Sequence, residues 1–477
     1  MRFCTITLGC KANQFDTSTI EGILTERGHT QARLGDGSDI CVINTCAVTA
    51  ESVRKSRQAV RRVKKLEPNA LIAVCGCFSE LEPETVTSIG ADLVGGADNR
   101  EAFALEIEKI ALMKNNSESA LPSESINHVT TTPIQSNRTR ALLKIQDGCD
   151  NYCAYCIIPF VRGRSRSTPL KKLTQQASKL EKQGFKEIII TGIEISSWKD
   201  PISTIQVEEQ NDNSDTKKAE NSASETGKSL YLIDVITAIS EVVPSTRLRI
   251  GSLDPIVLTD DLIGKLAQIP NLCNHFHISL QSGCDETLQR MGRKYKTSAV
   301  KQTINKLRES FPNCGITADL IVGFPGETDD EFNQTLDFIT NAAFSDMHIF
   351  PFSPRPGTSA ADMPSQLSKQ IIKERAKTAT EVANKMAETF KTKQLEKTVE
   401  VLFEQEKNGR MVGHSGNYLE VAVEAQPPKL QDPTPLSNEI ACTQNIPKTN
   451  SIHQVKIKKV ENDALIGELL IDKRLKN

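Results

Sequence analysis

Cys149, Cys153 and Cys156 lie within eight consecutive positions of the stretch DGCDNYCAYCIIP (147–159), and no fourth ligand follows nearby. A structural zinc ion normally has four Cys or His ligands in a closed tetrahedron, and this segment contains no histidine. Iron–sulfur clusters are held by cysteine thiolates. Three thiolates on a four-iron cluster would leave one iron free to bind another molecule. The spacing therefore favours such a cluster over the two alternatives, a zinc site and a disulfide.

Three further cysteines, Cys10, Cys46 and Cys77, each follow a predicted strand near the N-terminus. The predicted strands are RFCTITLG, DICVINT and ALIAVC. Because the carboxyl ends of parallel strands meet at one edge of a sheet, these thiols can converge on one point. The alternative is three independent buried thiols. We prefer Cys77 to Cys75, which lies inside the apolar run of its strand.

The overall composition is that of a globular protein, with 477 residues of which 38% are hydrophobic and 25% charged. No apolar run approaches the roughly 20 residues of a membrane span, and the N-terminus lacks the features of a secretory signal. We therefore expect a cytoplasmic protein without membrane contact. Clusters among its thirteen cysteines then indicate metal or redox chemistry. The net charge of −2 requires any nucleic-acid binding to depend on local basic patches.

Strand and helix patterns predict an α/β fold with three domains. Alternating strands and helices over 1–112 predict an open parallel-sheet domain. Six strands with helices between them over 138–364 predict a partial (βα)6 barrel. Short alternating runs over 398–477 predict a small C-terminal β-barrel. The remaining segments are a linker at 113–137, an insertion at 200–228, a connecting helix over 365–397 and an insertion at 426–450.

The predicted barrel strands indicate where the cysteines of the barrel domain lie. They are ALLKIQ, KEIIIT, TRLRIGS, NHFHISL, ITADLIVGF and DMHIFPF. Cys149, Cys153 and Cys156 come directly after the first of them, at the carboxyl end where barrels of this kind have their sites. The C-terminal strands are predicted at TVEVLFE, NYLEVAVE, HQVKIKKV and DALIGELLI.

The CxxxCxxC spacing, with Tyr155 before its last cysteine, resembles that of the radical S-adenosylmethionine (radical SAM) enzymes. Other motifs narrow the resemblance to the methylthiotransferases. They are LGCKANQ, NTCAVT, CGCFSE, GCDNYCAYCIIPFVRGRSRS, HISLQSGCDETLQRMGR, DLIVGFPGETDDEF and FPFSPRPGTSAADMP. The LGCKANQFD opening is most similar to the branch that acts on N6-threonylcarbamoyladenosine beside the tRNA anticodon. Sister branches modify isopentenyladenosine in tRNA or an aspartate of a ribosomal protein.

The resemblance implies two [4Fe–4S] clusters and S-adenosylmethionine as cofactors. Cys149, Cys153 and Cys156 would hold the cluster that cleaves S-adenosylmethionine, and Cys10, Cys46 and Cys77 would hold a second cluster that accepts sulfur. In the reaction that the resemblance implies, one molecule of S-adenosylmethionine would methylate the sulfur, and another would generate the radical that removes hydrogen from adenine C2. The implied partners are a tRNA anticodon loop, an electron donor and a sulfur donor. No side chain is assigned as a general base.

Four other positions are expected near the bound cofactor through the same resemblance. Tyr155 would approach its adenine, and Gly192, in the TGIE sequence after the second barrel strand, would allow close backbone approach. Glu194 would bind the methionyl ammonium or be solvated. Gln281 ends the fourth strand and is a candidate for ribose or carboxylate contact. For Gly192 the alternative is an ordinary turn glycine.

RNA binding is expected at two basic patches that flank the cysteines. Seven of the twelve residues in RKSRQAVRRVKK (54–65) are basic, and Val53, Val60 and Val63 form an apolar stripe opposite. The predicted phosphate contacts are Arg54, Arg57, Arg61, Arg162, Arg164 and Arg166. A solvated surface helix is the alternative for the first patch. The C-terminal barrel resembles the RNA-binding TRAM module, with Lys456, Lys458 and Lys459 as a further contact strip.

Two other hypotheses remain open at this stage. One is a non-enzymatic RNA-binding protein stabilised by zinc, and the other is a one-cluster radical enzyme with a vestigial first domain. Iron analysis separates them, because two clusters would contain about eight irons per chain, one cluster about four, and the zinc protein none.

Overall fold

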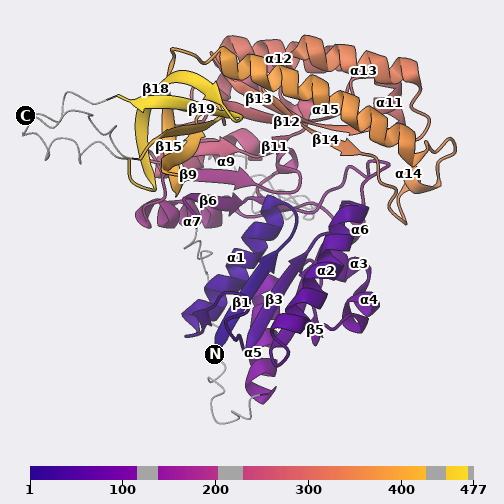
Figure 1. The fold of residues 1–477 in the computed structure, drawn as a ribbon, viewed down its shortest axis with the longest axis vertical. Helices are drawn as coiled ribbons and strands as arrows, with labels where there is room; N and C mark the ends of the chain where they lie inside the picture. Colours follow the sequence, from indigo (N-terminus) through magenta and orange to yellow (C-terminus); the bar gives the residue numbers. More distant parts are fainter. Residues whose placement is uncertain (115–137, 202–228, 426–446, 471–477) are drawn as a thin grey trace, which may run out of the picture.

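The computed structural model describes residues 1–114, 138–201, 229–425 and 447–470. The predicted linker 113–137 and the insertions 200–228 and 426–450 fall almost entirely outside these described residues. Figure 1 shows the N-terminal domain (indigo) below a larger domain (magenta to orange), with the C-terminal strands (yellow) against one side of the larger domain. The α/β fold class predicted from the sequence is confirmed.

A parallel five-stranded sheet of order β2-β1-β3-β4-β5 forms the centre of the N-terminal domain. Its strands are β1 (Arg2–Thr7), β2 (Thr30–Gln31), β3 (Ile40–Thr45), β4 (Leu71–Gly76) and β5 (Leu93–Val94). Its helices are α1 (Lys11–Glu26), α2 (Ala50–Leu66), α3 (Cys77–Leu81), α4 (Pro83–Ser88) and α5 (Arg100–Lys114). Strands β3 and β4 are buried along their whole length, because helices cover both faces of the sheet.

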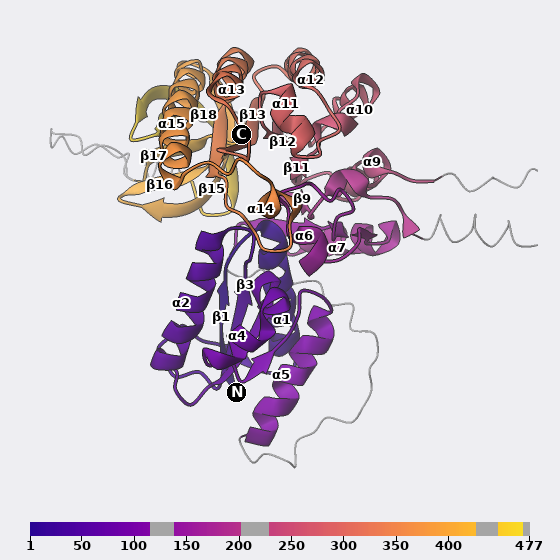
Figure 2. The same cartoon turned by 90° about the vertical axis from the view of Figure 1, so that its right-hand side faces the viewer.

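The two faces of this sheet have separate cores, and Figure 2 shows α2 and α5 on opposite sides of the strands. Helices α1 and α5 pack against a face that includes Phe3, Val42 and Cys75. Helices α2, α3 and α4 pack against the other face, whose core includes Ile43 and also Cys77 at the start of α3. Cys75 and Cys77 therefore belong to different cores.

Parallel strands form an arc through the larger domain, in the orders β6-β9-β10 and β11-β12-β13-β14. They are β6 (Arg140–Lys144), β9 (Glu187–Thr191), β10 (Arg247–Ile250), β11 (Ser252–Leu253), β12 (His275–Gln281), β13 (Gly315–Val322) and β14 (Asp346–Pro351). Strands β10 and β11 are one predicted strand interrupted at Gly251. With these two counted together, the six predicted strands follow one another in chain order, as in a partial barrel.

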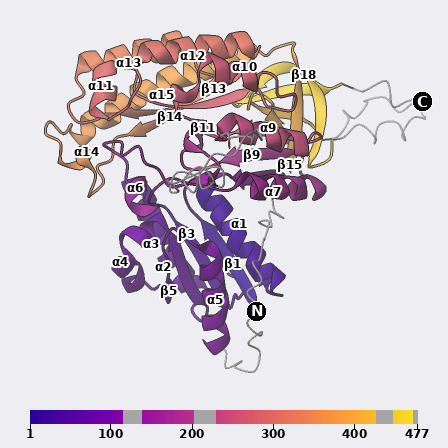
Figure 3. The same ribbon diagram turned by 180° about the vertical axis from the view of Figure 1, so that it is seen from behind.

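Helices cover the outer side of this arc, and Figure 3 shows α9, α10 and α12 there. The helices are α6 (Ile158–Val161), α7 (Leu170–Lys182), α9 (Leu232–Val242), α10 (Asp260–Leu266), α11 (Asp285–Arg290), α12 (Thr297–Ser310), α13 (Asp329–Ala342), α14 (Ser359–Asp362) and α15 (Lys369–Thr392), with 3-10 turns η2 (Ile195–Ser197) and η3 (Pro255–Val257). Helix α7 buries Leu173, Ala177 and Leu180, an apolar stripe at helical spacing. A short hairpin of β7 (Gln146–Asp147) and β8 (Arg166–Ser167) encloses the cysteine loop.

A closed five-stranded barrel of order β15-β16-β17-β19-β18 forms the C-terminal domain. Its strands are β15 (Thr398–Lys407), β16 (Arg410–Ser415), β17 (Glu420–Glu424), β18 (Ser451–Glu461) and β19 (Ala464–Leu469). Strand β16 was not predicted. Asn408 and Gly409 connect it to β15 with φ angles of 51° and 75°, and this Asn-Gly pair is a sequence indicator of a two-residue hairpin turn.

Helix α15 occupies the segment predicted as a connecting helix and packs against β14 and α13. Among the described residues, no helix combines the length and the apolar character needed to cross a bilayer.

Candidate active site

Cys10, Cys46 and Cys77 lie at the carboxyl ends of three neighbouring strands of the N-terminal sheet. Cys10 immediately precedes α1 and is exposed, whereas Cys46 follows β3 and Cys77 begins α3, and both of these are buried. Strands β1, β3 and β4 are adjacent in the sheet order. The three cysteine loops therefore emerge side by side from one edge, as the sequence predicts.

Two glycines allow these three loops to approach one another. Gly9 has a φ of +98°, and a Cβ at this position would lie 3.0 Å from Sγ of Cys46. Gly76 has a φ of +106°, and its Cβ would lie 2.4 Å from the carbonyl oxygen of Thr45. A larger residue at either position would push the loop of Cys10 or Cys77 away from Cys46.

Two buried asparagines tie the same loops together. The side-chain amide of Asn13 donates to the carbonyl oxygens of Leu8 at 2.7 Å and of Thr45 at 3.0 Å. The amide of Asn44 donates to the carbonyl oxygen of Asn13 at 2.9 Å. The backbone before Cys10 and the backbone before Cys46 are thus held by one side chain.

The thiols of this set influence one another's charge. Burial raises the pKa of Cys77 to about 11, the guanidinium of Arg162 acts in the opposite direction, and Cys10 and Cys46 add to the rise. Burial also raises the pKa of Cys46, and Cys10 contributes again. Iron binding at neutral pH therefore has to displace protons from these thiols.

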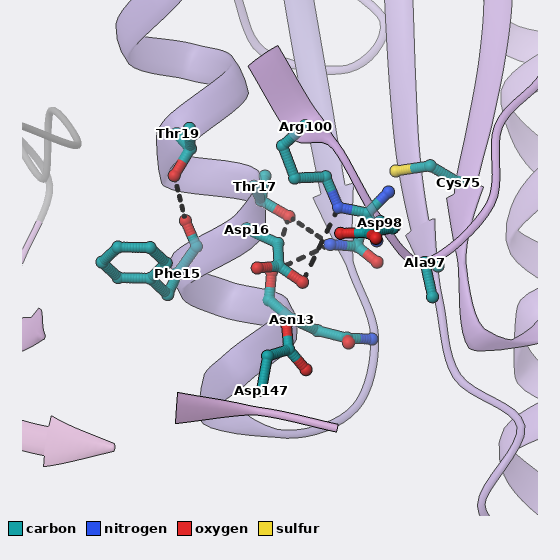
Figure 4. A network of polar contacts seen from close by, with 12 residues as sticks. Asn13, Phe15, Asp16, Thr17, Thr19, Cys75, Ala97, Asp98, Arg100 and Asp147 are labelled. Carbon is teal, nitrogen blue, oxygen red and sulfur yellow. Dashed lines mark hydrogen bonds and ion pairs between the residues drawn. The ribbon is translucent and has the colours of Figure 1, made fainter. Parts of the chain in front are cut away.

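Cys75 lies apart from this set. It is fully buried in the core beneath α1 and α5. Burial raises its pKa to about 11, while the charge of Arg100 lowers the pKa and that of Asp16 raises it. Figure 4 shows Cys75 on the far side of Arg100 from Asp16. This position supports the preference for Cys77 as the candidate ligand.

Cys149, Cys153 and Cys156 lie in the loop between β7 and α6, at the carboxyl end of the first barrel strand. The backbone N–H of Cys149 donates to the carbonyl oxygen of Gly163 at 3.1 Å, and the N–H of Cys156 donates to that of Cys153 at 2.9 Å. Burial raises the pKa of Cys149 to about 11 and that of Cys156 to about 12, and neighbouring thiols contribute to both. The loop thus presents three mutually close thiols.

The two cysteine sets lie near one another across the domain boundary. Helix α3 begins with Cys77 and packs against α6, which begins two residues after Cys156. Ile157, the residue after Cys156, belongs to the same buried cluster as Cys77 and Phe78. Both sets therefore face one region between the N-terminal domain and the barrel.

The two sets of three thiols supply the donors that iron–sulfur clusters use. Among the described residues, no three Cys, His, Asp or Glu side chains converge closely enough to hold a single metal ion. A structural zinc ion requires such convergence. A four-iron cluster binds each thiolate through a different iron, so its ligands stand farther apart.

Arg293 is a site residue that the sequence analysis missed. Its Nη1 donates to Sγ of Cys153 at 3.3 Å, and its Nη2 lies 3.0 Å from a carboxylate oxygen of Asp254. The side chain is only 6% exposed. Arg293 and Cys153 are 140 positions apart, so spacing alone could not connect them. The one sequence indication was its place inside the motif HISLQSGCDETLQRMGR.

The four predicted cofactor residues all lie around the cysteine loop or at strand ends. Tyr155 is partly buried against the cluster of Met291 and Phe324, and burial raises its pKa. Gln281 ends β12 with a φ of +66°.

Gly192 and Glu194 contact residues on either side of the cysteine loop. A Cβ at Gly192 would lie 2.7 Å from the carbonyl oxygen of Gln146, so close packing by itself accounts for glycine there. The amide of Asn151, inside the cysteine loop, donates to Oε2 of Glu194 at 3.4 Å. Burial raises the pKa of Glu194. Glu194 is therefore partly buried beside the loop.

The prediction that Arg162 contacts RNA is wrong, because its side chain is 0% exposed. Its Nη1 lies 2.7 Å from Asp147 and its Nη2 lies 3.0 Å from Asp16. Its Nε is buried and has no hydrogen-bond partner among the described residues. The positive charge of Arg162 also lowers the pKa of Cys77. Arg162 therefore contributes to the electrostatics of the buried site and not to an RNA-binding surface.

Asp16 is the centre of a buried charge network in which Arg162 takes part. Lys144 forms an ion pair with Asp16 and another with Asp147 at 2.8 Å. Nε of Arg100 lies 3.7 Å from Asp16 on the other side, and Figure 4 shows Asp16 on α1 facing Arg100. Helix α1, the barrel and helix α5 are thus joined by charges of opposite sign.

The other predicted RNA contacts are at the surface. Val53, Val60 and Val63 of α2 are buried, which confirms the predicted apolar stripe. Arg54, Arg61, Arg164 and Arg166 are exposed, and Arg57 is half-buried. Each lysine of the predicted C-terminal strip lies near a glutamate, in the pairs Lys456–Glu396, Lys458–Glu468 and Lys459–Glu461. Part of the charge of those three lysines is therefore balanced within the C-terminal region.

Comparison with known proteins agrees with the family resemblance found in the sequence. The radical SAM superfamily matches residues 143–339, and uncharacterized protein family UPF0004 matches residues 2–96. The threonylcarbamoyladenosine tRNA methylthiotransferase MtaB of Bacillus subtilis is 33% identical over 87% of this chain and 88% of its own length. The protein of that name from Chlamydia pneumoniae is 32% identical over 98% of both chains.

Two further matches complete the comparison. A tRNA-2-methylthio-N(6)-dimethylallyladenosine synthase from Clostridium tetani is 31% identical over 97% of this chain and 95% of its own length. Among solved structures, the radical S-adenosylmethionine methyltransferase TsrM from Kitasatospora setae, with cobalamin and a [4Fe–4S] cluster bound, has a TM-score of 0.52. That match covers 76% of this chain and 77% of the other at 12% identity, so the likeness is one of fold.

Proposed function

The chain belongs to the methylthiotransferase family of radical S-adenosylmethionine enzymes, and from this premise we propose that it adds a methylthio group to C2 of N6-threonylcarbamoyladenosine next to the tRNA anticodon. The observation that carries the proposal is the proximity of two sets of three cysteines across one domain boundary. Relatives named for this reaction match over most of the chain. We place the reaction in the cytosol, with an electron donor and a sulfur donor as further partners.

Each set of three cysteines would bind one of the two clusters. Cys149, Cys153 and Cys156 would hold one [4Fe–4S] cluster, and Cys10, Cys46 and Cys77 would hold the other. When bound, these clusters and S-adenosylmethionine supply the electron, the hydrogen-abstracting radical and the methylthio group.

Several side chains orient the reacting groups. Arg293 donates a hydrogen bond to Cys153 and so orients one thiolate of the barrel set. Glu194 accepts a hydrogen bond from Asn151 of the cysteine loop, and its partly buried carboxylate is positioned to bind an ammonium group. Tyr155 packs against the apolar cluster that includes Met291 and Phe324. No described side chain is needed as a base, because the aromatic C–H bond at C2 offers no acidic proton at neutral pH.

Nucleoside mass spectrometry of tRNA from a strain that lacks this gene tests the proposal. We expect loss of the methylthio derivative of N6-threonylcarbamoyladenosine and its return when the intact gene is restored. Relatives named for the dimethylallyl nucleoside also match, which makes the corresponding reaction the second candidate. Persistence of the threonylcarbamoyl derivative, with loss of the methylthio-isopentenyl nucleoside, would establish that second candidate and contradict the first.

A further inference from the structure

A pocket of about 430 Å³ lies between helix α2 and the segment that follows strand β14. Its polar lining consists mainly of Arg54, Arg57, Arg61, Glu82 and Arg355. We propose that this pocket binds a backbone phosphate of the RNA substrate, with Arg355 as its innermost cation. This inference rests on the proposed function, which supplies an RNA substrate, and it adds to that function a defined phosphate site and a residue outside helix α2.

Arg355 is the strongest indication of a ligand. The residue is only 5% exposed, and its Nε is buried with no hydrogen-bond partner among the described residues. A buried guanidinium is costly unless its donors are satisfied and its charge is balanced. Burial lowers its pKa, while the charges of Glu82 and Cys46 act in the opposite direction. The Nε atom itself is enclosed, so an anion in the pocket would act on the rest of the guanidinium, which lines the pocket, and would balance its charge.

The arginines of α2 add further cationic groups to the same pocket. Arg54, Arg57 and Arg61 recur at helical spacing and therefore share one face of α2. Arg57 is positioned by Glu82, at 2.8 Å from its Nη2, and by the ring of Phe78, whose centroid lies 5.4 Å from its Cζ. The Nε of Arg57 is also buried without a partner among the described residues.

The charge balance of the lining favours an anion with several oxygens. Four arginines face the pocket and Glu82 is the one acidic residue in its described lining. Arg54 is partly neutralised by Glu51, at 2.6 Å, which lies outside the lining. The planar fork of a guanidinium matches the oxygens of a phosphate in a bidentate manner. A backbone phosphate therefore fits the pocket better than a single carboxylate.

The pocket lies beside the N-terminal cysteine set. Ser56 of α2 hydrogen-bonds the backbone of Cys46, with its Oγ accepting from the N–H at 3.2 Å and donating to the carbonyl at 3.1 Å. The segment that carries Arg355 is joined to the start of α2, where the N–H of Ala50 donates to Oγ of Ser353 at 3.1 Å. A phosphate held here would place a nearby nucleotide at the boundary where the two cysteine sets meet.

Binding of an anticodon stem-loop RNA that contains N6-threonylcarbamoyladenosine tests this site. Fluorescence anisotropy of the labelled RNA is measured with anaerobically reconstituted full-length protein over a series of salt concentrations. We expect Arg355→Gln to raise Kd by about tenfold. We also expect it to lower the slope of log K against log salt by roughly 0.7, as for one lost contact to a single strand.

Two further variants show whether a change in RNA binding comes from the pocket itself. Arg61→Gln changes an exposed residue of the same pocket, so we expect weaker binding and a smaller salt slope without any effect on folding. Arg62→Gln is the matched control, because Arg62 is exposed on the same helix and outside the pocket lining. Its Kd should stay within a factor of two of the wild-type value.

The outcomes separate this site from the proposed function. Absence of RNA binding by the wild-type protein would count against the proposed function itself. Binding by the wild type with unchanged Kd and salt slope in both Arg355→Gln and Arg61→Gln would overturn the phosphate site alone. Equal weakening by Arg62→Gln would show general electrostatic attraction and would also overturn it.

Discussion

The guanidinium of Arg162 lies 3.0 Å from the carboxylate of Asp16, and both side chains are almost fully buried. Arg162 belongs to the segment that follows the barrel cysteines, and Asp16 belongs to the helix that begins after Cys10. The pair therefore joins the polypeptide segments of both cysteine sets. Together with the buried cluster that Ile157 shares with Cys77, its position explains how the two domains can present their thiols to one region.

We expect Arg162→Ala to lower the free energy of unfolding by about 3 kcal/mol, because Asp16 and Asp147 would lose a buried partner. Urea unfolding followed by circular dichroism measures the change. Arg164→Ala is the control, since Arg164 is exposed two positions away and should change the free energy by less than about 0.5 kcal/mol. Equal stability of the two variants would show that the buried pair contributes nothing.

Iron content tests the assignment of the N-terminal ligands. Reconstituted wild-type protein should contain about eight irons per chain. Cys77→Ala should contain about four and should still cleave S-adenosylmethionine, because the barrel cysteines are unchanged. Cys75→Ala is the matched control, since this thiol is fully buried in the opposite core. A loss of iron in Cys75→Ala with full content in Cys77→Ala would reverse the assignment.

The hydrogen bond from Arg293 to Cys153 should raise the reduction potential of the barrel cluster. A nearby positive charge and a donor to sulfur both favour the more negative, reduced form. Arg293→Gln should therefore shift the potential to more negative values, by on the order of 50 mV. A redox titration monitored by electron paramagnetic resonance measures it. Arg290→Gln should leave the potential unchanged, because Arg290 is paired with Glu331 at 2.6 Å.

Acid should weaken the contact between the barrel domain and the C-terminal barrel. Burial by itself raises the pKa of Glu187, but the charges and hydrogen bonds of Arg249 and Arg247 lower it from 4.5 to about 2. Both arginines also donate to carbonyl oxygens of the C-terminal barrel, Arg247 to His414 at 2.8 Å and Arg249 to Gly416 at 2.9 Å. The ionised carboxylate therefore holds the two cations that connect the domains.

The sign of this pH dependence follows from the lowered pKa. The stabilisation is complete above pH 4.5, where Glu187 is ionised in both folded and unfolded chains, and it is lost as the pH falls from 4.5 towards 2. Its size is about 3 kcal/mol. Chemical unfolding at a series of pH values should show this decline in the wild type and a smaller one in Glu187→Gln. Identical profiles for the two proteins would contradict the role of Glu187.

The sequence by itself determined the order of strands and helices and the position of every candidate cysteine at a strand end. These features are local, because apolar periodicity and strand length depend only on residues that are consecutive in the chain. The rule that parallel strands end at one edge then predicted that each set of cysteines would gather. The two-residue strands β2, β5, β7 and β8 were not predicted, and neither was β16, although the Asn408–Gly409 turn before β16 was a local indicator of it.

Only the tertiary structure decided which charged side chains are buried and what they contact. Arg162 and Arg164 are two positions apart and alike in sequence, yet one is enclosed by Asp16 and Asp147 and the other is exposed. Arg293 and Arg355 reach Cys153 and the surroundings of Cys46 across long separations in the chain. Such contacts depend on how whole domains pack, and no pattern of neighbouring residues contains that information.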